Sequence, residues 1–321
     1  MYGIGIIGLG VMGARMLAQF HDHPGFRVAA VWDPSDDACA NARAVVPGLL
    51  SAASAAGVVA TEGVDCVYIA SPPVTHLDYI AMVLDAGKAV LCEKPLALDV
   101  AASRAVVARA ETCGARAGVN FPQASSPAVR AVAAMIASGE LGTLERLEID
   151  LVFPCWPESW QVAARWLAYR EQGGFVREVV SHMAFLARRL LGPLEVVEAT
   201  FNYPPDGVGA ETRAHAVLRA GGLPVLLSGA IAAGESERTD WTLSGSKGAC
   251  RIHGWYSLAV ESSLAWSPVD LGLQPRDAAY RAQLDGLAAM IDGRPNAIAS
   301  LREGLDVQQC IEDLIVRPDR R

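Results

Sequence analysis

The sequence predicts an α/β protein with two domains, the first built on a doubly wound parallel sheet and the second on a large, open, mostly antiparallel sheet. Two observations carry this prediction. A glycine-rich turn follows the first apolar strand directly, and alternating strands and helices give way after about residue 140 to consecutive strands. We place the first domain at residues 1–120 and the second, an α+β domain, at residues 121–321, with the terminal helices able to pack back on the first.

The first strand, residues 2–7, runs into a Gly-x-Gly-x-x-Gly motif. The residues of this motif that are expected to meet a phosphate are Gly8, Gly10, Val11, Met12 and Gly13. Gly8 permits a tight turn, Gly10 lets a pyrophosphate approach the backbone, and Gly13 lets the following helix pack close to the strand. The first N–H groups of that helix, predicted over residues 14–20, carry a partial positive charge that favours phosphate. The motif therefore predicts a dinucleotide-binding turn.

A second apolar strand, residues 27–32, ends on Asp33, about twenty residues after the last glycine of the motif. Its carboxylate can accept hydrogen bonds from the adenosine ribose, although a turn residue before Pro34 is the simpler interpretation. The negative charge of Asp33 repels a 2′-phosphate, and no Arg or Lys occurs in the next four residues. We therefore expect NAD(H) to be favoured, with NADP(H) as the alternative cofactor.

Composition narrows the class of protein. The chain has 321 residues, a net charge of −8 and no basic run, which argues against nucleic-acid binding. No apolar run reaches the roughly 18 residues of a membrane span, and no positively charged leader precedes the first strand. The seven cysteines are scattered without a metal-binding spacing. We expect a cytoplasmic protein with a small-molecule substrate, no metal, no nucleic acid and no membrane.

The remaining elements follow from apolar periodicity. Further strands of the first domain are expected over residues 66–69, 89–92 and 115–119, with helices over 75–86 and 100–112. Strands of the second domain are expected over residues 144–153, 195–203, 213–219, 224–232, 240–244 and 249–253. One helix over residues 175–190 interrupts them, and helices over 277–291 and 300–315 close the chain. An open sheet face needs covering, so we expect a homodimer or homotetramer through that face.

Polar residues follow the strands of the first sheet at their carboxyl ends, where such sheets bind ligands. The residues expected to contact a cofactor there are Ser71, Pro72, Pro73, His76, Glu93, Lys94 and Asn120. The alternative is a rigid loop whose Thr75 caps the next helix. Lys94, between Glu93 and Pro95, is also placed to donate a hydrogen bond to a substrate oxygen during hydride transfer.

Three segments, GIGIIGLGVMG, SPPVTHLDYI and KAVLCEKPLA, together resemble the glucose–fructose oxidoreductase / inositol dehydrogenase / MocA family. The resemblance extends through the second half to the closing helices. It implies a Rossmann domain, a second domain whose open sheet often forms the oligomer interface, and reversible hydride transfer. The implied substrate is a carbinol or ketone, usually on a sugar or cyclitol, held between the domains beside a nicotinamide cofactor.

The resemblance also implies catalytic residues. Lys94 matches the family lysine, and His182 matches the histidine of an Asp-x-Gly-x-His motif. Here Glu178 replaces the aspartate of that motif, Val180 its glycine, and Phe185 the aspartate that usually follows. The four-residue spacing of a regular helix puts Glu178 and His182 on one face. The hypothesis is that His182 exchanges a proton with the substrate hydroxyl, Lys94 polarises the same oxygen, and Glu178 pairs with either.

The departures from the family pattern concern the substrate. The residues proposed to contact it are Trp160, Trp166, Arg177 and Phe185, although packing or solvation is the simpler role for each. The chain is interpreted as an NAD(P)-dependent oxidoreductase acting on a small cyclic substrate. Three alternatives stay open at this point: an imine reductase, an NAD-dependent glycoside hydrolase, and a non-catalytic protein that senses the cofactor.

Overall fold

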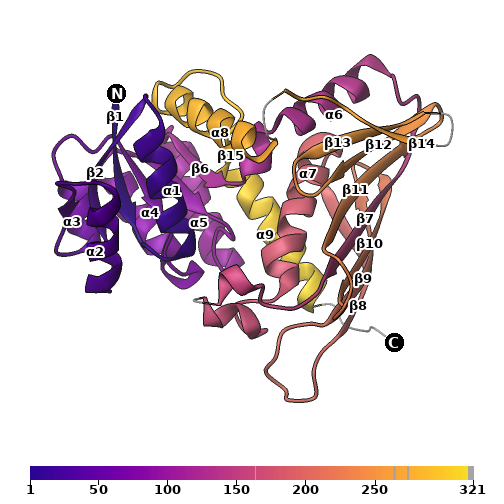
Figure 1. Cartoon of the computed structure of the whole chain (residues 1–321), viewed down its shortest axis with the longest axis horizontal. Coiled ribbons are helices and arrows are strands. Elements are labelled where there is room, and N and C mark those ends of the chain that lie inside the picture. Colours follow the sequence, from indigo (N-terminus) through magenta and orange to yellow (C-terminus); the bar gives the residue numbers. More distant parts are fainter. Residues whose placement is uncertain (163, 263–264, 273–274, 317–321) are drawn as a thin grey trace. The chain divides into compact units, whose positions relative to one another are not determined.

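The structure is a computed structural model that describes residues 1–162, 164–262, 265–272 and 275–316 (Figure 1). It divides into two compact units. The first contains Met1–Phe121 and Arg281–Leu305, and the second contains Pro122–Tyr280 and the chain from Asp306 onward. The first unit is therefore discontinuous, because a late segment of the chain completes it.

The first unit contains a seven-stranded sheet in the order β15-β6-β5-β4-β1-β2-β3. Its strands are β1 (Tyr2–Ile7), β2 (Phe26–Trp32), β3 (Leu50–Ser51), β4 (Cys66–Ile69), β5 (Ala89–Glu93), β6 (Ala117–Asn120) and β15 (Ala299–Ser300). Strands β1 to β6 run parallel in the dinucleotide-binding order 3-2-1-4-5-6, and β15 joins the β6 edge antiparallel. Every residue of β4 and β5 is buried, as expected of strands covered on both faces.

Helices connect these strands. They are α1 (Val11–Asp22), α2 (Asp36–Val45), α3 (Ala55–Ala60), α4 (His76–Asp85) and α5 (Val100–Thr112), with a 3₁₀ turn, η1 (Pro73–Thr75), before α4. The predicted parallel sheet is confirmed, but the short strands β3 and β15 were not predicted. The predicted cap was wrong: the Thr75 hydroxyl donates to the carbonyl of Pro72 and contacts the Ser71 hydroxyl, so it does not cap α4.

The second unit contains an eight-stranded sheet in the order β14-β13-β12-β11-β7-β10-β9-β8. Its strands are β7 (Leu144–Phe153), β8 (Leu194–Asn202), β9 (Arg213–Ala220), β10 (Leu223–Ile231), β11 (Arg238–Gly245), β12 (Gly248–His253), β13 (Ser257–Ser262) and β14 (Ala265–Pro268). Only β7 and β10 pair in parallel among these, so the mostly antiparallel sheet is confirmed. Buried and exposed residues alternate along β9, because one of its faces packs on the core.

The second unit also carries helices. They are η2 (Pro122–Ser125), α6 (Pro127–Ser138), η3 (Ser159–Gln161), η4 (Arg165–Ala168), η5 (Val176–Val180) and α7 (Ser181–Leu191), and α8 (Pro275–Ile291) and α9 (Leu301–Val316) each belong partly to both units. Strands β13 and β14 and helix α6 were not predicted. Helix α7 packs against β8 and β9. In the described part of the chain, no helix is long and apolar enough to cross a membrane.

A π-helical turn stands where the sequence predicted the start of a regular helix. The N–H of Ser181 donates to the carbonyl of Val176, five residues earlier, so η5 is wider than an α-helix. Glu178 lies within this turn and His182 is the second residue of α7, which follows it. The segment between the two residues is therefore not the regular helix that was predicted. Such turns are frequent at functional sites.

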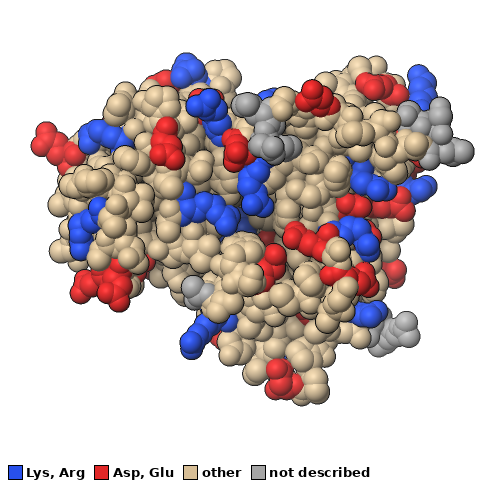
Figure 2. All heavy atoms as spheres, in the orientation of Figure 1, with Lys and Arg blue, Asp and Glu red and all other residues tan. Residues whose placement is uncertain are grey.

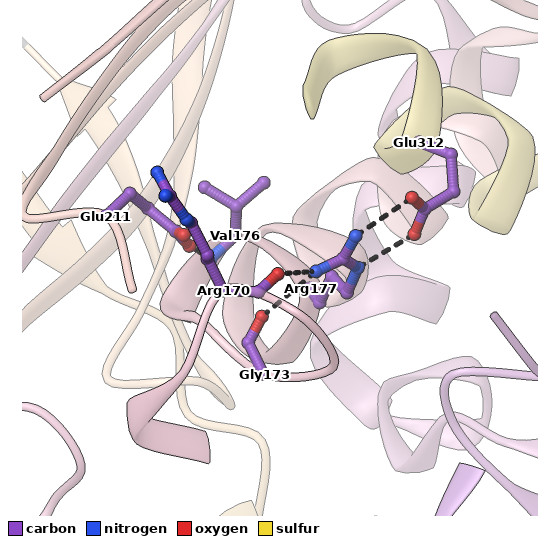
Figure 3. A network of polar contacts seen from close by, with 6 residues as sticks. All are labelled: Arg170, Gly173, Val176, Arg177, Glu211 and Glu312. Carbon is purple, nitrogen blue, oxygen red and sulfur yellow. Dashed lines mark hydrogen bonds and ion pairs between the residues drawn. The ribbon is translucent and has the colours of Figure 1, made fainter. Parts of the chain in front are cut away.

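A buried carboxylate holds the start of this turn (Figure 3). Glu211 accepts a hydrogen bond from the N–H of Val176, with 2.5 Å between Oε1 and N. A Cβ on Gly174 would lie 2.5 Å from both oxygens of Glu211, and the φ of Gly174 is +99°. Glycine is therefore required at this position by both space and backbone conformation. Glu211 satisfies an N–H group that the helix start leaves without an intrahelical partner.

Arg177 ties the same turn to α9. Its Nε and Nη2 donate to the two carboxylate oxygens of Glu312 at 2.8 and 3.0 Å, and its Nη1 donates to the carbonyl oxygens of Arg170 and Gly173 (Figure 3). The Arg177 residue is only 9% exposed. The guanidinium is engaged in structural contacts that fix the turn, and its contact with substrate stays a prediction.

Replacing Arg177 by Met is expected to destabilise the fold by about 3 kcal/mol, because Glu312 keeps its charge in a largely buried place without its partner. Urea unfolding measures the effect. The double variant Arg177→Met/Glu312→Leu is the matched control, and it should recover much of the loss since no unpaired charge remains. A single variant as stable as the wild type would contradict this role.

The buried carboxyl of Glu211 should make the stability of the fold depend on pH. Burial raises the pKa of Glu211 above its ordinary value of 4.5, against the hydrogen bond from Val176 and the charge of Arg177, which lower it. Because the pKa of the carboxyl is higher in the folded state than in the unfolded state, its contribution to the free energy of unfolding is complete below the unfolded-state pKa. That contribution is lost as the pH rises through the folded-state pKa. The stability of wild type relative to Glu211→Gln should therefore be greatest below the ordinary pKa of 4.5 and fall as the pH rises above it. Urea unfolding at several pH values tests this, and a constant difference would refute it.

Candidate functional site

The glycine turn after β1 has the geometry that the motif predicted. Gly8 has a φ of +93°, and a Cβ on Gly13 would lie 2.0 Å from the carbonyl oxygen of Gly8. A Cβ on Gly10 would meet nothing within 4 Å. The fold itself therefore requires the first and third glycines, whereas the second borders open space at the start of α1. That space, beside the first N–H groups of α1, where Val11 and Met12 lie, fits a pyrophosphate.

Asp33 follows β2 and is tied to the glycine turn. Its Oδ2 accepts the N–H of Leu9 at 2.7 Å, and its Oδ1 accepts the N–H of Ser35 at 2.8 Å. Each carboxylate oxygen has a second lone pair, so these contacts orient the side chain and leave it able to accept from a ribose hydroxyl. The turn role and the ribose role, which the sequence posed as alternatives, are compatible in this geometry.

His76 connects the loops that follow β4 and β5. Its Nε2 lies 2.8 Å from the carbonyl oxygen of Ser71, and its Nδ1 lies 2.9 Å from that of Pro95. The residue is 1% exposed, and burial lowers its pKa below 6.5, against the carbonyl contacts that raise it. His76 thus connects the loop of Ser71, Pro72 and Pro73 to the loop of Lys94, and its contact with a cofactor stays a prediction.

Glu93, the last residue of β5, is the centre of a buried polar network. Its carboxylate accepts from the Tyr68 hydroxyl on β4 and from Nδ2 of Asn120 on β6, the latter at 2.5 Å. The Asn120 carbonyl in turn accepts from Nε2 of Gln283 at 2.9 Å. Glu93 and Asn120 were predicted to contact a cofactor, whereas the structure engages both within the sheet. The network fixes the end of β5, from which half-buried Lys94 continues.

His182 is held by neighbours within the second unit. Its Nδ1 lies 3.0 Å from the side-chain oxygen of Gln123, a residue only 2% exposed. An oxygen acceptor at Nδ1 requires the proton there, so the neutral ring carries its lone pair on Nε2. The ring also stands edge-to-face with Trp255, with centroids 5.6 Å apart at 83°. An imidazole in this tautomer is suited to accept a proton.

Carboxylates gather near this histidine. Burial first, and then the negative charges of Glu237 and Glu178, raise the pKa of Glu158. Glu237 accepts a hydrogen bond from Nε1 of Trp255 at 2.9 Å. The sequence prediction missed Glu158, Glu237, Gln123 and Trp255, because they come from separate loops that no local pattern connects.

The proposed aromatic contacts with substrate have different outcomes. Phe185 is fully buried in α7 under Arg189, which places it in the core, and its contact with substrate stays a prediction. Trp160 is 44% exposed and Trp166 is half-buried, and both stay candidates.

In the described residues, no group of three or more His, Cys, Asp or Glu side chains could hold a metal ion. Figure 2 shows acidic and basic side chains interspersed on the visible face.

The two glycines make a matched pair of variants. Gly13→Ala should lower the thermal unfolding midpoint, because its Cβ overlaps the Gly8 carbonyl. Gly10→Ala should leave that midpoint close to wild type but weaken NAD⁺ binding about tenfold or more, because the methyl group fills the space of the pyrophosphate. Thermal unfolding and calorimetric titration measure the two effects. If Gly10→Ala binds NAD⁺ as wild type does, the pyrophosphate does not approach this residue.

The comparisons with known proteins agree with this architecture. Residues 2–121 match a family described as an oxidoreductase family with an NAD-binding Rossmann fold, and residues 129–251 match the GFO/IDH/MocA C-terminal domain. The chain is 36% identical over 142 residues to inositol 2-dehydrogenase 1 of Mycolicibacterium vanbaalenii, covering 44% of this chain and 41% of that protein. It is 29% identical over 212 residues to inositol 2-dehydrogenase of Mycolicibacterium gilvum, covering 64% and 58%. These matches span about half the length of the two relatives.

A solved structure shows the same fold. The crystal structure of a myo-inositol dehydrogenase from Corynebacterium glutamicum is similar with a TM-score of 0.79 and 23% identity, covering 98% of this chain and 96% of that one. The resemblance stated from the sequence is thus confirmed over both domains. The chain belongs to the GFO/IDH/MocA family of oxidoreductases, whose N-terminal domain is an NAD-binding Rossmann fold.

Proposed function

We propose that this protein is an NAD-dependent dehydrogenase of a small cyclic polyol, in which His182 and Lys94 act on the reacting hydroxyl. The proposal depends mainly on one observation: Nδ1 of His182 is hydrogen-bonded to the side-chain oxygen of buried Gln123. The inositol 2-dehydrogenase relatives support a cyclitol as the substrate class. The glycine turn supports the cofactor, since Gly10 leaves room for a pyrophosphate.

The chemistry divides between the carbinol carbon and its oxygen. When bound, NAD⁺ supplies the acceptor for the hydride that leaves the carbinol carbon. The hydroxyl proton passes to Nε2 of His182, while Gln123 keeps the Nδ1 proton in place. The Lys94 ammonium donates to the same oxygen and stabilises the negative charge that develops on it. The products are a ketone, a reduced cofactor and a protonated imidazole, so that charge and atoms balance.

Glu178 supports the charge that forms on the imidazole. It lies about one turn before His182, in the π-helical turn that Glu211 and Arg177 anchor. A carboxylate at this distance along the helix stabilises an imidazolium more than a neutral ring. In this proposal glutamate takes the role of the usual family aspartate, and it does so from a turn that is wider than an α-helix.

Asp33 determines the cofactor preference in this proposal. Its carboxylate is oriented by Leu9 and Ser35, and both ribose hydroxyls of NAD⁺ are potential donors to it. A 2′-phosphate brings negative charge to the same place, so NADP⁺ is disfavoured. The expected homodimer or homotetramer through the open sheet face stays a prediction.

The test combines binding with turnover. NAD⁺ and NADP⁺ are titrated calorimetrically into nucleotide-free protein, and NADH formation is then followed with myo-inositol, scyllo-inositol and a panel of cyclic sugars. We expect NAD⁺ to bind more tightly and at least one polyol to be oxidised. His182→Asn and Lys94→Met should each lower kcat by about a hundredfold or more, with NAD⁺ affinity for His182→Asn unchanged.

An exposed lysine provides the control for Lys94. Lys247→Met, in the turn between β11 and β12, should leave kcat unchanged. Turnover near wild type in both His182→Asn and Lys94→Met would refute the assigned roles. Tighter binding of NADP⁺ would refute the Asp33 argument alone, and sugar release without net cofactor reduction would favour a hydrolase.

A further inference from the structure

Trp255 has a backbone conformation that tryptophan rarely adopts. It lies in the turn that joins β12 to β13, and its φ is +73°, next to Gly254 with a φ of +52°. Among the described residues, every other positive φ belongs to glycine. Gly254, Trp255 and Tyr256 form the three-residue turn between the paired residues His253 and Ser257. A positive φ there disfavours a residue with a side chain, because its Cβ crowds the backbone. A tryptophan in this place therefore holds the backbone in a strained conformation.

The indole has two partners that this conformation allows. It stands edge-to-face with the ring of His182, and its Nε1 donates to Oε1 of Glu237 at 2.9 Å. The hydrogen bond between Nδ1 of His182 and Gln123 fixes the direction of one ring nitrogen. A ring packed at 83° to the imidazole plane adds a restraint on the orientation of that plane. Both restraints act on the geometry that proton transfer requires.

We propose that Trp255 is a positioning residue for His182, held in a strained turn so that its indole fixes the plane of the imidazole. Glu237 fixes the indole in turn through Nε1. All four side chains, those of Gln123, His182, Glu237 and Trp255, belong to the second unit. The inference rests on the proposed role of His182, and it adds a residue that the sequence motif of the family does not contain.

Three variants separate positioning from mere packing. Trp255→Asn removes the indole but accepts a positive φ, Trp255→Phe keeps an aromatic ring without the N–H donor, and Glu237→Gln keeps an acceptor oxygen for Nε1. The first readout needs no substrate: the imidazole C–H signals of His182 in NMR spectra, assigned with His182→Asn. The ring-current displacement from the indole should vanish in Trp255→Asn and persist in Glu237→Gln.

The second readout is kinetic, with NAD⁺ and the polyol that wild type oxidises best in the screen that includes myo-inositol. Trp255→Asn should lower kcat about ten- to hundredfold, as expected for a misplaced catalytic group, with the KM for NAD⁺ unchanged. Trp255→Phe should recover most of this loss. The thermal unfolding midpoint of Trp255→Asn should stay at or above that of wild type, because the strained φ is relieved.

Each outcome decides the proposal. An unmoved His182 signal in Trp255→Asn, or a kcat within about twofold of wild type, would overturn it. If Trp255 served only packing, Trp255→Asn would have a lower unfolding midpoint and an unchanged kcat per folded molecule, which is the opposite pattern. If wild type oxidises none of the polyols, the proposed function fails, while the NMR signals still determine whether Trp255 orients His182.

Discussion

A carboxylate can be buried only where hydrogen bonds replace its water, and this constraint shapes one candidate functional segment in each of the two units. Glu93 meets it with Tyr68 and Asn120 from the flanking strands. Glu211 meets it with the N–H of Val176. In each case these hydrogen bonds fix the segment next to the buried carboxylate. That segment carries Lys94 in the first unit, and Glu178 with His182 in the second.

The surroundings of His182 show how a single side chain is oriented by parts of the chain that are distant in sequence. Gln123 comes from the 3₁₀ turn before α6, and Trp255 from a hairpin of the sheet. Glu178 comes from the π turn that Arg177 joins to α9. The contacts of the imidazole with Gln123 and Trp255 therefore depend on segments of the second unit other than the helix that carries His182.

Local signals explain what the sequence predicted correctly. The glycine turn, the strand before Asp33 and the position of Lys94 after β5 depend on neighbours a few residues away, so composition and spacing reveal them. The ion pair of Arg177 and the burial of Phe185 were not predicted, because residues distant in sequence determine them. The carboxylate of Glu312 lies 135 positions from Arg177, and the burial of Phe185 follows from tertiary packing. The π turn and the strain at Trp255 are backbone features without a compositional signature.

The discontinuity of the first unit has a consequence for biosynthesis. Gln283, which completes the Asn120 network, and β15, which pairs with β6, both lie beyond the whole continuous segment of the second unit. At roughly 5–20 residues per second, a ribosome takes about 10 to 30 seconds to pass from residue 121 to residue 281. During that interval β6 is an edge strand with an unpaired ladder, the kind of surface that invites aggregation. The β6 edge of the nascent dinucleotide-binding sheet therefore stays uncovered until β15 has been synthesised and pairs with it.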